Sequence, residues 1–186
     1  EEILPNNVIG TYNVFEAARS AGVKRIVFAS SGAAVSGWEH EMPYQALVEG
    51  RYEEVGERWE KLTHETPCRP SGLYGCSKVW GEALARHFSD TFGLSVLCLR
   101  IGSVSTEDRP KLGSSSSNQP QQMRQFSVWC SQNTIGRMVE ACVEAPEALK
   151  FDVFFVVSNN KWSYRDMDHA RDVLGFEPDG SAEDWR

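Results

Sequence analysis

Residues 72–103, GLYGCSKVWGEALARHFSDTFGLSVLCLRIGS, decide the fold of this chain. Large apolar side chains recur at every fourth position of the first part, a spacing that predicts a helix with one buried ridge. They are Trp80, Leu84, Phe88 and Phe92. Gly93 is expected to end the helix, and the apolar run 94–102 predicts a strand buried on both faces. A helix joined to a buried strand by so short a link is typical of α/β folds.

The same helix–strand pair recurs on both sides of this stretch. Helices are predicted over 5–22, 72–92 and 133–145, and the strands that follow them over 23–30, 94–102 and 150–158. A last helix is expected over 163–176, begun by a capping box between Ser163 and Asp166. Helices that alternate with apolar strands predict the α/β class, with a parallel sheet covered on both faces.

Two segments interrupt this alternation. Residues 46–62 are rich in charge and are expected to form a solvated, partly helical insertion. Residues 111–122, KLGSSSSNQPQQ, are polar and of low complexity, which predicts a mobile loop.

Composition narrows the possible functions. A chain of 186 residues predicts one domain, and a net charge of −7 without a basic stripe argues against nucleic acid as a partner. No apolar run approaches the roughly 18 residues of a membrane span. The five cysteines contain no CxxC pair and the four histidines no metal spacing, so neither a disulfide framework nor a metal site is predicted. Reduced thiols favour the cytoplasm, and Cys98 and Cys142 are expected in the core.

Tyr74 and Lys78 lie four residues apart where the central helix begins, so their side chains point to one face. A tyrosine has an unperturbed pKa of about 10 and is a poor base at neutral pH. A nearby ammonium group favours the phenolate and lowers that pKa. The pair can therefore take a proton from a hydroxyl group. The same spacing is common on ordinary helix surfaces, so the pair alone is a weak signal.

Small and hydroxyl-bearing residues follow two of the predicted strands. ASSGAAVSG (29–37) follows the first, and Gly102 and Ser103 follow the second. Ligands of α/β proteins bind at the carboxyl ends of parallel strands. A plain glycine–serine turn explains either segment alone, but together with Tyr74 they predict three elements that converge on one crevice.

Four motifs then occur in a fixed order: NxxGTxNVxEAA (7–18), RIVFASS (25–31), RPSGLYGCSK (69–78) and LRIGS (99–103). Together they resemble the extended short-chain dehydrogenase/reductase superfamily of the NAD-dependent epimerase/dehydratase type. With LYGxSKxxGExLAR and the later MRQFSVW (123–129), the chain is most similar to uronate dehydrogenases and related NAD-dependent sugar dehydrogenases. The resemblance implies the C-terminal part of a Rossmann-like, doubly wound parallel sheet. Residues 1–186 would form one partial domain, with substrate-side elements mainly at 103–130 and 146–186.

The resemblance also implies a role for individual residues. The implied catalytic residues are Tyr74, Lys78 and Ser31; those next to the cofactor are Tyr74, Lys78, Ile101 and Asn7; those next to the substrate are Ser31, Gly32, Ser103 and Arg124. Tyr74 would act as the general base, and Lys78 would hold the nicotinamide ribose. The planar guanidinium of Arg124 would bind a sugar carboxylate with two hydrogen bonds; the alternative is a solvated loop arginine.

Some positions depart from the family pattern. Gly32 and Ala33 stand where uronate dehydrogenases carry Asn-His, and many epimerases carry their active serine or threonine at the position of Gly32. Ser31 must then supply the polar anchor. The segments 46–62 and 111–122 are longer than usual in the family, which predicts an altered substrate preference.

The resemblance predicts an NAD-dependent oxidoreductase, with NADP not excluded, that oxidises a sugar or sugar acid at its anomeric carbon to a lactone. A nucleotide-sugar epimerase or dehydratase is the alternative within the superfamily, and a non-catalytic fragment or binding module is the alternative outside it. Helices matching 5–22 and 72–92 commonly form a dimer interface in this superfamily, which implies a homo-oligomer.

The family's first strands, with their Gly-rich turn, would precede Glu1. The strand over 23–30 is therefore expected to be an open edge. Residues 1–186 alone are expected to bind NAD poorly and to fold marginally. A fluorescence titration that gives micromolar NADH affinity would contradict this expectation.

Overall fold

Three parallel strands form one sheet in the computed structural model, which describes residues 2–111 and 119–186. The strands are β1 (Arg25–Ser31), β2 (Ser95–Ile101) and β3 (Phe151–Val156), and they lie in this order across the sheet. Phe28 lies opposite Cys98, and Cys98 lies opposite Val153. The α/β class and the parallel sheet are confirmed, and β1 is an edge of the sheet that the described residues form.

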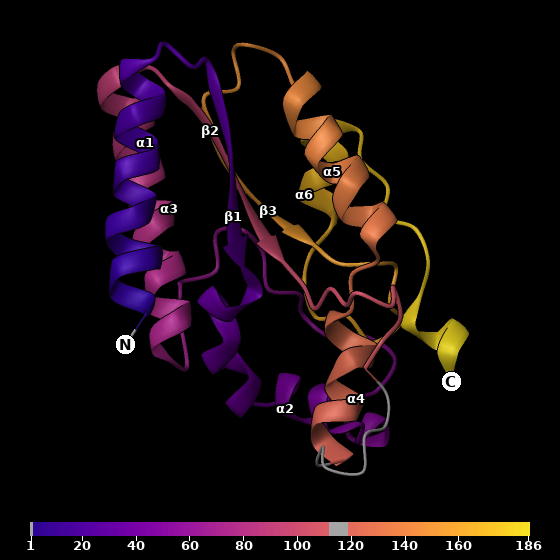
Figure 1. Ribbon diagram of the computed structural model, residues 1–186. Coiled ribbons are helices and arrows are strands. Elements are labelled where there is room, and N and C mark those ends of the chain that lie inside the picture. The colour runs from indigo at the N-terminus through magenta and orange to yellow at the C-terminus, as the bar shows by residue number, and fades with distance from the viewer. Residues whose placement is uncertain (1, 112–118) are drawn as a thin grey trace.

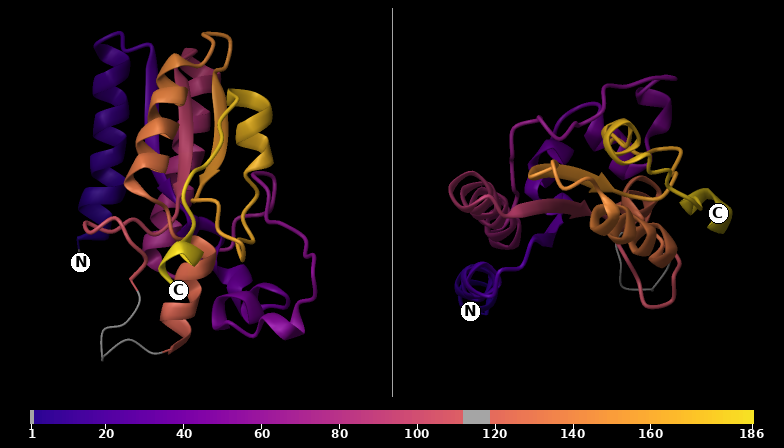
Figure 2. Two further views of the ribbon diagram at one scale, coloured as in Figure 1. Left: turned by 90° about the vertical axis from the view of Figure 1, so that its right-hand side faces the viewer. Right: turned by 90° about the horizontal axis from the view of Figure 1, so that it is seen from above.

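Helices cover both faces of the sheet (Figure 1). One layer holds α3 (Leu73–Phe92) and α1 (Thr11–Ser20), which continues without a break from a π-helical segment, η1 (Leu4–Gly10). The other layer holds α5 (Gln132–Glu144) and α6 (Asp168–Leu174). Figure 2 shows the sheet between these two layers when the molecule is seen from above.

Shorter elements gather beyond the carboxyl ends of the strands, at the lower end of Figure 1. They are η2 (Gly32–His40), α2 (Tyr44–Glu49), η3 (Tyr52–Glu54) and α4 (Gln119–Val128), with η4 (Ala182–Trp185) beside them. The backbone of β2 leads into this region, where Ser103 forms a parallel bridge with Trp129. This end of the sheet is where parallel α/β folds bind ligands.

The central helix α3 rests on β1 through small residues. Its buried face includes Gly81, Ala85 and Phe88, whereas Trp80 and Leu84 are only partly buried and Phe92 is 47% exposed. The predicted ridge of large apolar residues is thus buried only in part. The helix approaches β1 closely at Gly81, where an added Cβ would lie 2.3 Å from Cζ of Phe28.

Gly81→Ala is therefore expected to lower the free energy of unfolding by about 1–3 kcal/mol, because overpacking outweighs the better helix propensity of alanine. Gly136→Ala in α5 is the matched control, since a Cβ there meets nothing within 4 Å. This control should stabilise the protein by up to about 1 kcal/mol. Urea unfolding of the two variants checks the opposite signs, and equal signs would contradict the packing described for α3.

The last predicted helix is shorter than expected, and its capping box is absent. The backbone of Tyr164 and Asp166 bonds to Leu62, with Leu62 N donating to Tyr164 O (2.7 Å) and Asp166 N donating to Leu62 O (2.9 Å). Residues 163–166 are thus held outside the helix, and α6 begins at Asp168. The Asp166 carboxylate instead accepts from the backbone N–H groups of Asp168 and His169.

The two interrupting segments also differ from expectation. Residues 46–62 are not a solvated insertion throughout, because Leu47 of α2 is fully buried and Leu62 is 2% exposed. Residues 112–118 of the predicted loop lie outside the described residues, and the segment from Gln119 onward belongs to α4.

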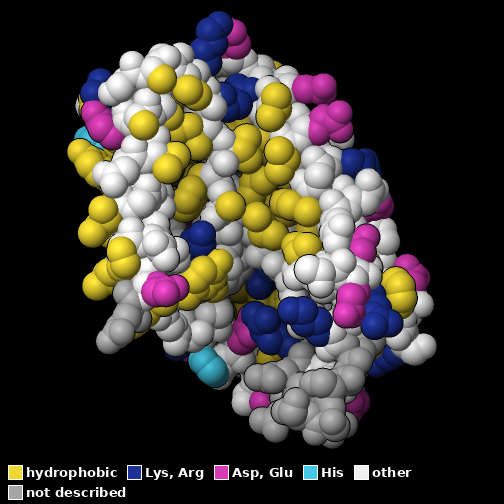
Figure 3. Space-filling view, in the orientation of Figure 1, with side chains coloured by type: hydrophobic (Ala, Val, Ile, Leu, Met, Phe, Trp, Pro, Cys, Tyr) yellow, Lys and Arg dark blue, Asp and Glu magenta, His cyan; other side chains and the backbone are white. Residues whose placement is uncertain are grey.

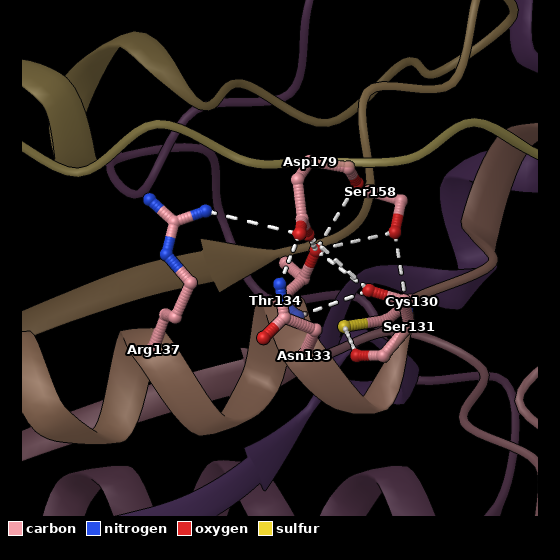
Figure 4. A network of polar contacts seen from close by, with 7 residues as sticks. All are labelled: Cys130, Ser131, Asn133, Thr134, Arg137, Ser158 and Asp179. Atoms are coloured by element: carbon pink, nitrogen blue, oxygen red, sulfur yellow. Dashed lines mark hydrogen bonds and ion pairs between the residues drawn. The ribbon is translucent and has the colours of Figure 1, made fainter.

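A polar network fastens the chain after α6 to the start of α5 (Figure 4). Ser131 caps α5 by accepting from Thr134 N. The Asp179 carboxylate accepts hydrogen bonds from Ser131 Oγ (3.4 Å), Thr134 Oγ1 and Asn133 Nδ2. Burial alone would raise the pKa of Asp179, but these hydrogen bonds and Arg137 outweigh it, and the pKa is lowered.

Asp179 should make stability depend on pH. A carboxyl group with a lowered pKa in the folded state contributes stability above its unfolded value of about 3.9, and the contribution is lost as the pH falls through the folded pKa. Asp179 is 37% exposed, so water screening limits the effect to the order of 1 kcal/mol. Asp179→Asn should lower stability at pH 7 and converge with the parent at pH 2–3, as measured by urea unfolding. A constant difference across this range would contradict the role of the carboxylate.

All five cysteines are free thiols, and Cys98 and Cys142 are fully buried, as predicted. None of the helices in the described ranges combines the length and apolar character needed to cross a bilayer.

Candidate functional site

Tyr74 and Lys78 lie side by side in the first turns of α3. The Lys78 Nζ is 5.4 Å from the centre of the Tyr74 ring, and it donates a 2.9 Å hydrogen bond to the carbonyl of Ala29 in β1. Tyr74 is 47% exposed. Partial burial lowers the pKa of Lys78. The predicted pair is thus brought together beside the end of β1, with the phenol open to a ligand.

Asn7 reaches the same turn of α3 from η1. Its Nδ2 donates to Ser77 Oγ (3.0 Å), and Ser77 Oγ donates to the carbonyl of Tyr74 (2.7 Å). Asn7 therefore fixes the backbone that carries Tyr74. Ser77 is a part of this arrangement that the motif analysis did not single out, although it lies three residues after Tyr74 on the same helix.

Ser31 and Ile101 meet at the carboxyl ends of β1 and β2, where their Cα atoms are paired in register. Ser31 Oγ accepts from Ala33 N (3.1 Å) and so caps η2. The start of η2 in turn packs on α3, because an added Cβ at Gly75 would lie 2.5 Å from the carbonyl of Ala33. The end of β1, the end of β2 and the first turn of α3 therefore border one region.

Ser103 lies just beyond β2. Its N–H donates to the carbonyl of Val128 (2.7 Å), and its own carbonyl accepts from Cys130 N (3.0 Å). These two bonds hold the backbone after β2 against the end of α4, and Ser103 is partly buried.

Arg124 lies on α4, and it is bound by a carboxylate of the chain itself. Its Nε and Nη2 donate to the two carboxylate oxygens of Glu39 at 2.6 and 2.7 Å. The hydroxyl of Tyr164 donates to the same carboxylate. Burial would raise the pKa of Glu39, but the hydrogen bonds and charge of Arg124 outweigh it and lower that pKa. Arg124 is 31% exposed, so it is not the solvated loop arginine of the alternative prediction.

Arg165 is a residue of this region that the sequence did not reveal. Its guanidinium lies against Gly32, where an added Cβ would be 2.2 Å from Cζ of Arg165. Arg165 is 3% exposed, and its buried Nε and Nη1 have no hydrogen-bond partner in the part of the chain that the structure describes. Lys and Arg side chains gather at this lower end of the molecule in Figure 3. The absence of a side chain at Gly32 thus makes room for a buried cation.

Within residues 2–111 and 119–186, no cluster of three or more His, Cys, Asp or Glu side chains is arranged to hold a metal ion. The groups that gather at the strand ends are a phenol, an ammonium, hydroxyls and guanidiniums. Such groups can move a proton and bind a polar or anionic ligand.

The chain is similar to several known proteins. The chain is 36% identical over 186 residues to a uronate dehydrogenase from Agrobacterium fabrum, covering 100% of this chain and 58% of that protein. It is 33% identical over 184 residues to an NAD-dependent glucose-6-phosphate dehydrogenase from Haloferax volcanii, covering 98% and 64%. The chain therefore spans less than two thirds of the length of either relative.

A solved structure shares the fold. It is a mutant uronate dehydrogenase from Agrobacterium tumefaciens complexed with NAD, with a TM-score of 0.73 and 33% sequence identity. The similarity covers 97% of this chain and 56% of that one. Residues 1–129, which carry Asn7, Ser31, Tyr74, Lys78 and Ser103, match one family pattern. The chain belongs to the NAD dependent epimerase/dehydratase family.

Proposed function

We propose that the protein is an NAD-dependent dehydrogenase that oxidises a sugar acid at its anomeric carbon and yields a lactone. The observation that carries the proposal is the Tyr74–Lys78 pair beside the carboxyl ends of β1 and β2. The names of similar proteins, uronate dehydrogenase and glucose-6-phosphate dehydrogenase, support oxidation of an anionic sugar.

The residues at the strand ends can perform the proton transfer that this oxidation needs. Tyr74 takes the proton of the anomeric hydroxyl, and the Lys78 ammonium lies beside the phenol, 5.4 Å from the centre of its ring. Ser31 Oγ, at the end of β1, hydrogen-bonds the same substrate oxygen. The net change is loss of two electrons and two protons from the sugar, which becomes the lactone.

The residues present fit the nicotinamide end of the cofactor. The Lys78 ammonium provides three donors, of which one is used by Ala29, and Tyr74 adds a half-exposed phenol beside it. Ile101 offers a partly buried apolar side chain at the adjoining strand end. NAD, when bound, supplies the two-electron acceptor for the sugar.

An assay of NADH absorbance separates this function from the alternatives. With the full chain that the gene encodes, we expect net NADH formation from D-glucuronate and none from a UDP-sugar. Epimerisation of a UDP-sugar without net formation of NADH would favour an epimerase, a type of enzyme that the family also includes. Absence of both reactions would favour a non-catalytic binding module.

The remaining parts of the proposal concern the molecule as a whole. Residues 1–186 would be part of one Rossmann-like domain, with the substrate-side elements at 103–130 and 146–186. The free cysteines support a cytoplasmic location. Exposed apolar side chains on η1 and α1 support a homo-oligomer; they are Leu4, Ile9 and Val14, each at least 58% exposed.

A further inference from the structure

We propose that Arg165, rather than Arg124, binds the carboxylate of the substrate. This inference rests on the proposed function, because it names the residue that recognises the sugar acid at the same site. Four observations carry it: the burial of the Arg165 guanidinium, its lack of hydrogen-bond partners, its position at Gly32, and the occupation of Arg124 by Glu39.

The buried guanidinium of Arg165 lowers the stability of the fold when no ligand is bound. A buried cation is normally paired and hydrogen-bonded, since removal from water costs several kcal/mol. Arg165 is 3% exposed, and its buried Nε and Nη1 have no hydrogen-bond partner within the described ranges. Its one described aromatic contact is the ring of its neighbour Tyr164, 5.6 Å from Cζ. A residue kept at such a cost is explained when an anionic ligand pairs with it.

The position of Arg165 places it at the proposed reaction site. Its guanidinium lies where a side chain of residue 32 would stand, directly after Ser31 at the end of β1. Any larger residue at Gly32 would collide with the guanidinium, since an added Cβ would be 2.2 Å from Cζ. A carboxylate bound there would hold the sugar next to Ser31.

The charges around the site favour an anion. The two carboxylate oxygens of Glu39 are engaged by Arg124 and Tyr164. The charge of Arg165 also contributes to the lowered pKa of Glu39, yet no hydrogen bond joins the two side chains within the described ranges. The Glu39 carboxylate is thus paired with Arg124, which leaves the positive charge of Arg165 without a hydrogen-bonded counter-ion in the described ranges. A substrate carboxylate would neutralise it and accept hydrogen bonds from the guanidinium.

The test compares Arg165→Met, Arg165→Lys and Arg124→Met in the full chain that the gene encodes. Arg86→Met is the matched control, because Arg86 is a surface residue paired with Asp90. The substrates are D-glucuronate, D-glucose 6-phosphate and uncharged D-glucose. Steady-state kinetics gives KM and kcat separately, and thermal unfolding is recorded with and without D-glucuronate.

We expect Arg165→Met to raise the KM for D-glucuronate about 100-fold, since a bidentate charged pair is lost. The kcat and the KM for D-glucose should change little, and Arg165→Lys should be intermediate because it keeps the charge without the planar fork. Without ligand, Arg165→Met should raise the melting temperature by a few degrees, as an unpaired buried charge is removed. D-glucuronate should then stabilise the parent but not this variant.

Three results would overturn the inference: an unchanged KM in Arg165→Met, a larger KM effect in Arg124→Met, or a lower melting temperature of Arg165→Met, which would show a structural role. Dependence on Arg165 with D-glucose 6-phosphate alone would overturn the choice of a carboxylate. The ligand-induced shift in melting temperature needs no turnover. An Arg165-dependent shift in a protein that forms no NADH would therefore reject the proposed oxidation and support the binding site.

Discussion

Tyr74→Phe is expected to lower kcat for sugar oxidation about 1,000-fold, within the range that general acid–base catalysis contributes. The change removes only the hydroxyl that accepts the substrate proton. No hydrogen bond of this hydroxyl is found within the described residues, and the side chain is 47% exposed, so the fold should be unaffected. NADH oxidation and formation, followed by absorbance, measure the loss.

Tyr12→Phe is the matched control, because Tyr12 is also a helical tyrosine that is 47% exposed, but it lies on α1. Its kcat should equal that of the parent, and the melting temperatures of both variants should stay within about 2 °C of it. Retention of more than a tenth of the parent kcat by Tyr74→Phe would reject Tyr74 as the general base.

Glu82→Gln is expected to lower the free energy of unfolding by about 3–5 kcal/mol, which is a large part of the stability of a typical domain. Glu82 of α3 and Arg100 of β2 are 6% and 3% exposed, and they share two hydrogen bonds of 3.0 and 2.8 Å. Ser30 of β1 donates to the same carboxylate at 2.6 Å. The pair thus joins α3 to two strands, and its loss leaves a buried guanidinium uncompensated.

The exposed pair of Arg86 and Asp90 on the same helix serves as the control for this prediction. Asp90→Asn should change stability by only about 0.3–0.5 kcal/mol, since both side chains are more than half exposed. Replacing both buried partners, Glu82→Met with Arg100→Met, should restore at least half of the loss. Urea unfolding measures all three, and a loss below about 1 kcal/mol in Glu82→Gln would contradict the importance of the pair.

The sheet could be predicted because each strand is visible in the sequence as a separate apolar run. The ends of the strands were predicted less accurately. Strand β2 begins at Ser95 and ends at Ile101, one residue inside the predicted range 94–102 at each end. Helix α3 was predicted nearly to its ends, but its buried face only in part, since Phe88 is buried whereas Phe92 is exposed. A close approach at Gly81 depends on Phe28 of β1, and an apolar ridge read from one helix does not contain that partner.

Contacts between distant segments explain the remaining errors. Residues 163–166 have helical character in the sequence, yet Leu62 holds them in extended backbone. The charge-rich segment 46–62 begins with Ala46, Leu47 and Val48, which are buried in α2.

The residues of the candidate site could likewise be predicted from the sequence only in part. Tyr74, Lys78 and Ser31 belong to local motifs and could be named from the sequence. Arg165 could not, because its position depends on the approach of residues 163–166 to Gly32. Glu39 lies in a segment without a motif, so nothing in the sequence indicated that it would pair with Arg124.

Oxidation of a sugar at its anomeric carbon can be tested with D-glucuronate that carries deuterium at C1. The full chain that the gene encodes is incubated with this sugar and NAD, and mass spectrometry follows the label in the reduced cofactor and in the sugar. We expect one deuterium atom per molecule of NADH and an unlabelled lactone. Deuterium that remains at C1 of the sugar, with no labelled NADH, would contradict this expectation.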